Sequence, residues 1–106
     1  MALRKERGSN KTKGLCKLAI DEDMTIYVID MLKQELTEQI ETYENFELNL
    51  TDVEEFDSAG VQLMLAFKQE LKSKNKTFQL TAASPSVTNL ITRYGLSESF
   101  NLGEGE

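Results

Sequence analysis

The sequence predicts a small α/β domain: a mostly parallel or mixed sheet of about four strands, with helices mainly on one face. Short segments with alternating apolar and polar residues take turns with longer segments whose apolar residues recur every three or four positions. The unit of a strand followed by a helix occurs three times, and this order favours parallel strands joined by right-handed crossovers. The strands are not apolar throughout, which indicates that the other sheet face stays partly open.

The first half of the chain supplies one strand and one helix of this pattern. Residues 15–20 form a strand with Cys16, Leu18 and Ile20 on one face, so Cys16 is expected to be a small buried hydrophobe. After the acidic residues 21–23 a helix covers about residues 26–43, with Thr25 as a plausible N-cap. Its apolar stripe predicts a core-facing side: Ile29, Leu32, Leu36, Ile40 and Tyr43.

The second half repeats the pattern twice. Residues 46–50 and 78–81 alternate as strands, and residues 58–73 form a helix between them. Ser84 and Pro85 suit the N-cap and first position of a last helix, and Gly95 suits the left-handed residue after it. Phe100 is expected to be the last core anchor. Each of these two helices has an apolar arc that faces the core: Val61, Met64, Leu65, Phe67 and Leu71 in the first, and Val87, Leu90, Ile91 and Tyr94 in the second.

Length and composition suit one soluble domain. The chain has 106 residues, of which 40% are hydrophobic and 28% are charged. We expect residues 14–102 to form the domain and residues 103–106 to be frayed. Residues 1–13 are expected to be a flexible basic segment, or in part an edge strand. The single cysteine, and the lack of a signal segment or of the roughly 20-residue apolar run that spans a bilayer, favour a cytoplasmic protein without membrane insertion.

Charge and residue content exclude several functions. The net charge is −6, of which residues 1–13 contribute +4, so residues 14–106 carry −10. An acidic body disfavours nucleic acid and suits a basic or mixed-charge protein partner. The chain has no histidine, which excludes Ser-His-Asp and Cys-His catalysis and any histidine-containing metal site. We therefore expect no enzyme activity, no cofactor and no metal.

The candidate functional stretch is Asp57-Ser58-Ala59-Gly60, at the joint between a strand and a helix. The simplest interpretation is a helix cap, worth about 1 kcal/mol, in which Asp57 or Ser58 accepts from a backbone amide. Gly60 then permits a close backbone approach, or is merely tolerated in the first turn. Paired acids such as Glu54 and Asp57 have no calcium-loop pattern and suit a solvated rim better than a cation site.

A second interpretation is a phosphorylation switch at Ser58. A phosphoryl group adds about −1.5 to −2 charges and would lie at the positive end of a helix dipole, so the fold is kept. It would also crowd the neighbouring acids Asp57, Glu54, Glu55 and, across the turn, Asp23, which would alter a desolvated interface. A nucleophilic Ser58 is a third interpretation. No histidine is present to act as its base. A nucleophile elbow also needs glycine two residues before the serine, and this position is Phe56.

Residues from about 15 to 100 resemble the STAS domain of bacterial anti-sigma factor antagonists. The matching stretches are MTIYVIDMLKQEL, LNLTDVEEFDSAGVQLML and TAASPSVTNLITRYGL. Two features depart from the family. The usual Gly-Glu-Leu or similar turn before the first helix is Glu22-Asp23-Met24 here, without glycine, and the family's first strand is hard to find in residues 3–13.

The resemblance implies a partner-switching role. In the family, the antagonist binds an anti-sigma factor that is also a serine kinase, and this frees the sigma factor. The kinase phosphorylates the serine that matches Ser58, which ends the binding, and a metal-dependent phosphatase removes the phosphate. The resemblance implies that the partner surface includes these residues: Asp23, Met24, Thr25, Asp57, Ser58, Ala59, Gly60, Gln62 and Ser84.

Two other functions stay open. STAS-like single domains also serve as subunits of lipid-transport ABC complexes, where the same face docks on an ATPase and Ser58 would be a packing or capping residue. A small hydrolase is the third hypothesis, disfavoured by the missing histidine. We expect a monomer, because no apolar stripe is left without a place in the core.

Overall fold

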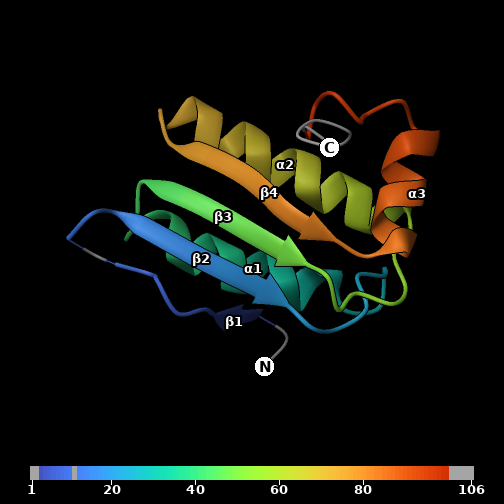
Figure 1. The fold of residues 1–106 in the computed structure, drawn as a ribbon, viewed down its shortest axis with the longest axis horizontal. Coiled ribbons are helices and arrows are strands. Elements are labelled where there is room, and N and C mark those ends of the chain that lie inside the picture. Colours follow the sequence, from blue (N-terminus) through green and yellow to red (C-terminus); the bar gives the residue numbers. More distant parts are fainter. Residues whose placement is uncertain (1–2, 11, 101–106) are drawn as a thin grey trace.

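The computed structural model describes residues 3–10 and 12–100, which form a single sheet with three helices (Figure 1). The sheet order is β1-β2-β3-β4. Strands β2, β3 and β4 are parallel, and β1 pairs antiparallel with β2. The α/β class and the parallel core of the sheet are therefore as predicted. The elements are β1 (Leu3–Lys5), β2 (Leu15–Ile20), α1 (Ile29–Ile40), β3 (Asn45–Leu50), α2 (Ser58–Ser73), β4 (Thr77–Ala83) and α3 (Pro85–Arg93).

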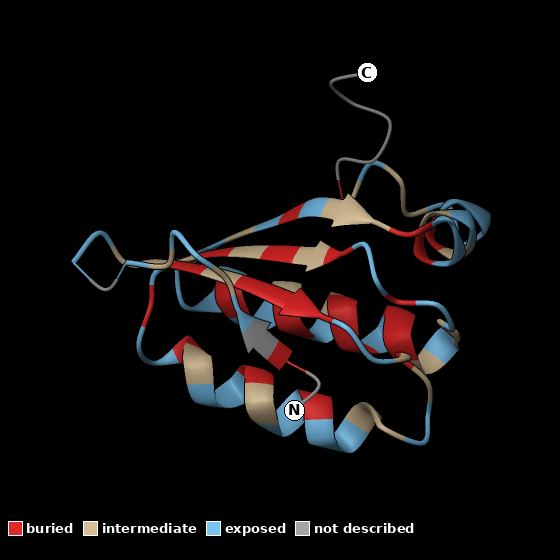
Figure 2. Cartoon of the chain, turned by 60° about the horizontal axis from the view of Figure 1, so that its bottom comes forward, coloured by how far each residue is buried: buried red, intermediate tan, exposed pale blue. Residues whose placement is uncertain are grey.

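Helices α1 and α2 lie under one face of the sheet, with their buried residues toward it (Figure 2). Strand β3 shows why: Phe46, Leu48 and Leu50 are buried, whereas Glu47 and Asn49 on the opposite face are only half-buried. That opposite face is polar and carries the Lys17–Glu47 ion pair at 3.9 Å. Helix α3 lies apart from α1 and α2, beyond the end of β4 (Figure 1). This arrangement confirms the expected one-sided cover.

A chain of edge-to-face aromatic rings crosses the core. The ring centroids are 5.6–6.3 Å apart, within the range in which such pairs attract. Phe100 is buried at its end, and the Lys68 ammonium lies 5.5 Å from its ring centroid. Phe100 thus ties the segment after α3 to the core, as expected. The rings follow one another in the order Tyr43, Phe46, Phe67, Phe78 and Phe100.

The predicted boundaries of two helices are confirmed, and the predicted start of a third helix is wrong. Ser84 caps α3 by accepting from the Val87 amide, and Gly95 has a φ of 73° after its last turn. Helix α2 begins at Ser58 and ends at Ser73, as predicted. Helix α1 begins at Ile29 and not near residue 26, so Thr25 is not its N-cap. The reason lies in contacts of residues 24–26 that are described with the site.

Three further details concern the expectations for the two ends of the chain and for Tyr94. Leu3–Lys5 form the edge strand β1, which is the alternative that the sequence left open for part of residues 1–13. Tyr94 is not a core residue, because half of its surface is exposed. The expected end of the domain at residue 102 and the frayed residues 103–106 lie outside the described residues. Among the described residues, no helix combines the length and apolar character needed to cross a bilayer.

Candidate functional site

Two segments far apart in sequence meet in front of α2. The Met24 amide donates to the Glu55 carbonyl at 2.8 Å, and the Asp57 amide donates to the Met24 carbonyl at 3.3 Å. The Glu55 amide donates to Oδ1 of Asp23 at 3.1 Å. Met24 is fully buried beneath this contact. The acidic turn before α1 and the loop before α2 therefore form one unit.

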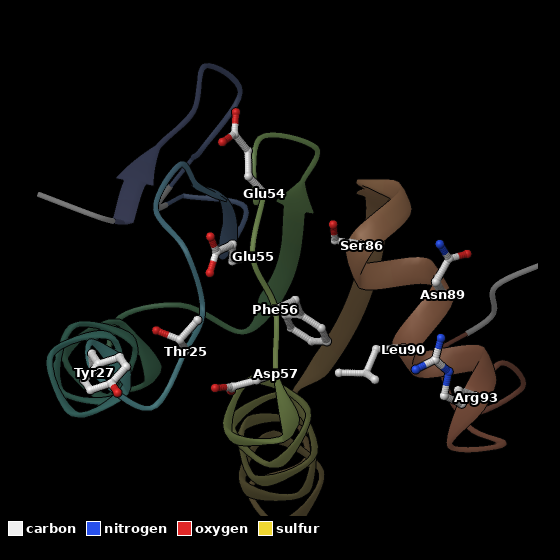
Figure 3. Close-up of a pocket in the computed structure, with 10 residues that line it drawn as sticks. All are labelled: Thr25, Tyr27, Glu54, Glu55, Phe56, Asp57, Ser86, Asn89, Leu90 and Arg93. Carbon is white, nitrogen blue, oxygen red and sulfur yellow. The ribbon is translucent and has the colours of Figure 1, made fainter.

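The Asp57 carboxylate holds this unit to the helix. Its Oδ1 accepts from the amides of Ala59 at 2.9 Å and Gly60 at 3.4 Å, which caps α2. Its Oδ2 accepts from the Ile26 amide at 3.2 Å, and Figure 3 shows the carboxylate turned toward the Thr25 segment. Residues 24–26 are thus held along the loop before α2. This explains why α1 cannot begin at residue 26.

Gly60 is required by a close approach of backbone. A Cβ atom at this position would lie 2.8 Å from the Met24 carbonyl oxygen and 2.7 Å from the Phe56 ring. Both distances are shorter than any ordinary carbon contact. Of the two interpretations of Gly60, the close approach is therefore the correct one.

Ser58 is the first residue of α2 and is exposed. Because Asp57 caps the helix, the Ser58 hydroxyl is not needed for capping. It makes no hydrogen bond to any of residues 3–10 or 12–100. The structure therefore presents a free hydroxyl at the positive end of a 16-residue helix.

The other residues implied by the resemblance divide by exposure. Gln62 is exposed like Ser58, and four residues are half-buried: Asp23, Thr25, Asp57 and Ala59. The three buried ones are Met24, Gly60 and Ser84.

Ser84 belongs to the internal framework of the site. Its hydroxyl donates to the Val53 carbonyl and accepts from the Val87 amide. Its own amide donates to the Leu50 carbonyl at 3.1 Å. Ser84 therefore links the loop before α2 to α3, and its buried hydroxyl donates one hydrogen bond and accepts another within the fold.

The sequence reasoning missed an exposed apolar pair beside Ser58. Ile26 is 67% exposed and Tyr27 is 93% exposed. Ile26 lines a surface cavity together with Ala59 and Gln62 at the start of α2. A signal was present in the sequence, because both residues precede the apolar stripe that starts at Ile29. Large apolar side chains left in solvent next to a candidate site indicate an interaction surface.

A second surface cavity, of about 510 Å³ and open to solvent, has Asp57 and Tyr27 in its lining (Figure 3). The loop before α2 divides it, with Glu55 and Asp57 directed toward the Thr25 segment and the Phe56 ring toward α3. Leu90 and Arg93 line its α3 side. Within the described residues, no cluster of three or more acidic or cysteine side chains is arranged to hold a metal ion.

Solved structures with this fold include anti-sigma factor antagonists. The antagonist from Mycobacterium paratuberculosis matches with a TM-score of 0.78 and 19% identity, over 94% of this chain and 84% of that one. The antagonist SpoIIAA in its unphosphorylated form matches with a TM-score of 0.73 and 18% identity, over 92% and 84%. The phosphorylated form of SpoIIAA from Bacillus matches with a TM-score of 0.69 and 17% identity, over 92% and 86%. At these identities the likeness shows a shared fold.

Sequence comparison shows the family. No curated protein sequence matches the chain. A family model described as "Mlab, STAS domain" matches residues 8–104, which is nearly the whole chain. The chain therefore belongs to the STAS domain family.

Proposed function

We propose that this chain is an anti-sigma factor antagonist-like binding protein in a partner-switching pathway. It binds a serine kinase that is also an anti-sigma factor, and phosphorylation of Ser58 ends the binding. A serine phosphatase restores the active form. The domain works as a cytoplasmic monomer and catalyses no reaction itself.

The observation that carries this proposal is the division of labour between Asp57 and Ser58. Asp57 caps α2 and holds residues 24–26, so Ser58 is free at the surface. A phosphoryl group on Ser58 would be stabilised by the helix dipole, and the cap would stay in place. The fold is then kept while about −1.5 to −2 charges appear on the interface.

The surroundings of Ser58 suit such a switch. The exposed Ile26 and Tyr27 offer apolar area for a partner. Tyr27 also lines one cavity together with the acids Glu54, Glu55 and Asp57 of the loop before α2. A phosphate added to this acidic rim repels acidic groups of a partner and changes the charge of a desolvated interface sharply. The switch therefore acts by charge and needs no change in the sheet.

The test uses three single substitutions in the full chain. Ser58→Asp is expected to abolish binding to the copurified kinase, and Ser58→Ala is expected to bind constitutively in the presence of ATP. Gln69→Asp adds the same charge on an exposed position of α2, about 16 Å along the helix, and should bind like the wild type. Isothermal titration with the purified partner gives the affinities. Equal affinity of Ser58→Asp and the wild type would refute the switch.

A second candidate is a subunit of a lipid-transport ABC complex. The description of the matching family model favours considering it, because it names an Mlab STAS domain and not an antagonist. In this role the same face docks on an ATPase. The expected result is copurification with that ATPase, with Ser58→Ala and Ser58→Asp retaining equal affinity and Ser58 unmodified in every state by mass spectrometry.

A further inference from the structure

A groove runs along the outer surface between α1 and α2. It consists of two adjoining cavities of about 330 and 390 Å³, both lined by Lys33, Leu63 and Ala66. The floor is apolar, because the outer edges of core residues reach it, among them Leu36 and Phe67. Along the groove, the edges of core side chains from α1 and α2 are therefore accessible to solvent.

The groove begins at the candidate site. Ile26, Ala59 and Gln62 line the end beside Ser58, and Ile40 and Glu70 line the far end. On α2 this is a distance of eleven residues, or about 16 Å, which corresponds to three helical turns. Small side chains at Ala59 and Ala66 leave room for another backbone to come close.

Charged residues mark the rim at intervals. Asp30 lines the cavity next to Ser58, Lys33 lies where the two cavities join, and Glu70 lies at the far end. Glu70 is paired with Lys74 at 3.6 Å. The side chains of Asp30 and Lys33 form no ion pair with any other described residue. These two charges are therefore available to a partner.

We infer that this groove receives an amphipathic α-helix of the binding partner. The inference rests on the proposed function, because it extends the interface at Ser58 along α1 and α2. The partner helix has an apolar face about three turns long, an acidic residue opposite Lys33 and a basic residue opposite Asp30. An apolar channel with side-chain walls fits a helix that anchors residues at steps of three and four. An extended strand would need unpaired backbone groups, which two helix faces do not offer.

The first test fills the groove without touching the core. Ala66 is exposed and lines both cavities, so Ala66→Arg obstructs them at their junction. Gln69→Arg is the matched control, since Gln69 is exposed on the same helix and lines neither cavity. With the partner that copurifies with Ser58→Ala, purified and measured by titration calorimetry, Ala66→Arg should raise Kd by about tenfold or more. Gln69→Arg should change it by less than about twofold, and both variants should keep the wild-type melting temperature.

The second test identifies the occupant by charge exchange. Lys33→Glu should weaken binding by about three- to tenfold, and replacing one acidic residue on the partner helix by lysine should restore it in the double variant. Full affinity of the folded Ala66→Arg variant would overturn the groove inference, while a lost response to Ser58→Asp would separately refute the switch. If no acidic position on a partner helix rescues Lys33→Glu, the assigned occupant is wrong.

Discussion

The carbonyl oxygen of Met24 lies 2.8 Å from the point that a Cβ atom on Gly60 would occupy. The Met24 carbonyl and the Cα atom of Gly60 both belong to the backbone, so neither can rotate away as a flexible side chain would. The segment before α1 and the first turn of α2 are therefore in direct contact, and the free Ser58 hydroxyl lies beside this contact.

Gly60→Ala should loosen this contact and destabilise the domain. The added methyl group forces the Met24 segment and the Phe56 ring to move, at a cost of about 1–3 kcal/mol. Urea unfolding measures the free energy, with Ser58→Ala as the control in the same turn. A wild-type midpoint for Gly60→Ala would contradict the close approach.

Asp57→Ala should remove the cap of α2 and release residues 24–26. The loss of the cap alone costs about 1–2 kcal/mol, and the Ile26 amide loses its acceptor. Hydrogen exchange should then be faster at Ile26, Ala59 and Gly60. Asp52→Ala, at an exposed loop position, is the control and should leave all three exchange rates unchanged.

Ser84→Ala should destabilise the fold without acting on the partner surface directly. The substitution leaves the buried Val53 carbonyl without its donor and the Val87 amide without its cap, a cost of about 1–3 kcal/mol. Ser86→Ala, on the exposed first turn of α3, should cost much less. If the folded Ser84→Ala variant keeps full partner affinity, Ser84 supports the site from within. A strong loss of affinity in a stable variant would instead assign it a contact.

Cys16 should be unreactive in the folded protein. Burial raises the pKa of its thiol from 9.0 to about 11, although the nearby Lys5 ammonium opposes the shift. Because the thiolate is the reactive form, a thiol reagent should label Cys16 slowly at neutral pH and rapidly in denaturant. Fast labelling of the native protein would show that the strand opens.

The same shift of the Cys16 pKa makes stability fall at alkaline pH. Above pH 9.0 the thiol ionises in the unfolded chain but stays neutral in the folded one until about pH 11. The unfolded state then binds fewer protons, so this contribution is complete below pH 9.0 and is lost as the pH rises toward 11. Urea midpoints measured across this window should fall more steeply for the wild type than for Cys16→Ser, which does not titrate there.

The sequence by itself determined the features that depend on neighbours within a few residues. Four such features could be predicted, because each depends on local backbone geometry or on which side of an element faces solvent. They are the alternation in β3, the apolar arc of α2, the Ser84-Pro85 start of α3 and the glycine after α3. The joint Asp57-Ser58 was readable for the same reason. Which of Asp57 and Ser58 is the cap could not be predicted, because either side chain can accept from amides in the first turn of the helix.

Only the tertiary structure decided how the site is assembled. The late start of α1 follows from the hydrogen bond between Asp57 and Ile26, which are 31 residues apart. The need for glycine at position 60 follows from the Met24 carbonyl, and the exposure of Ile26 and Tyr27 follows from the same contact. Such contacts leave no periodic trace in the sequence, since they join segments that come together only when the sheet and helices have packed.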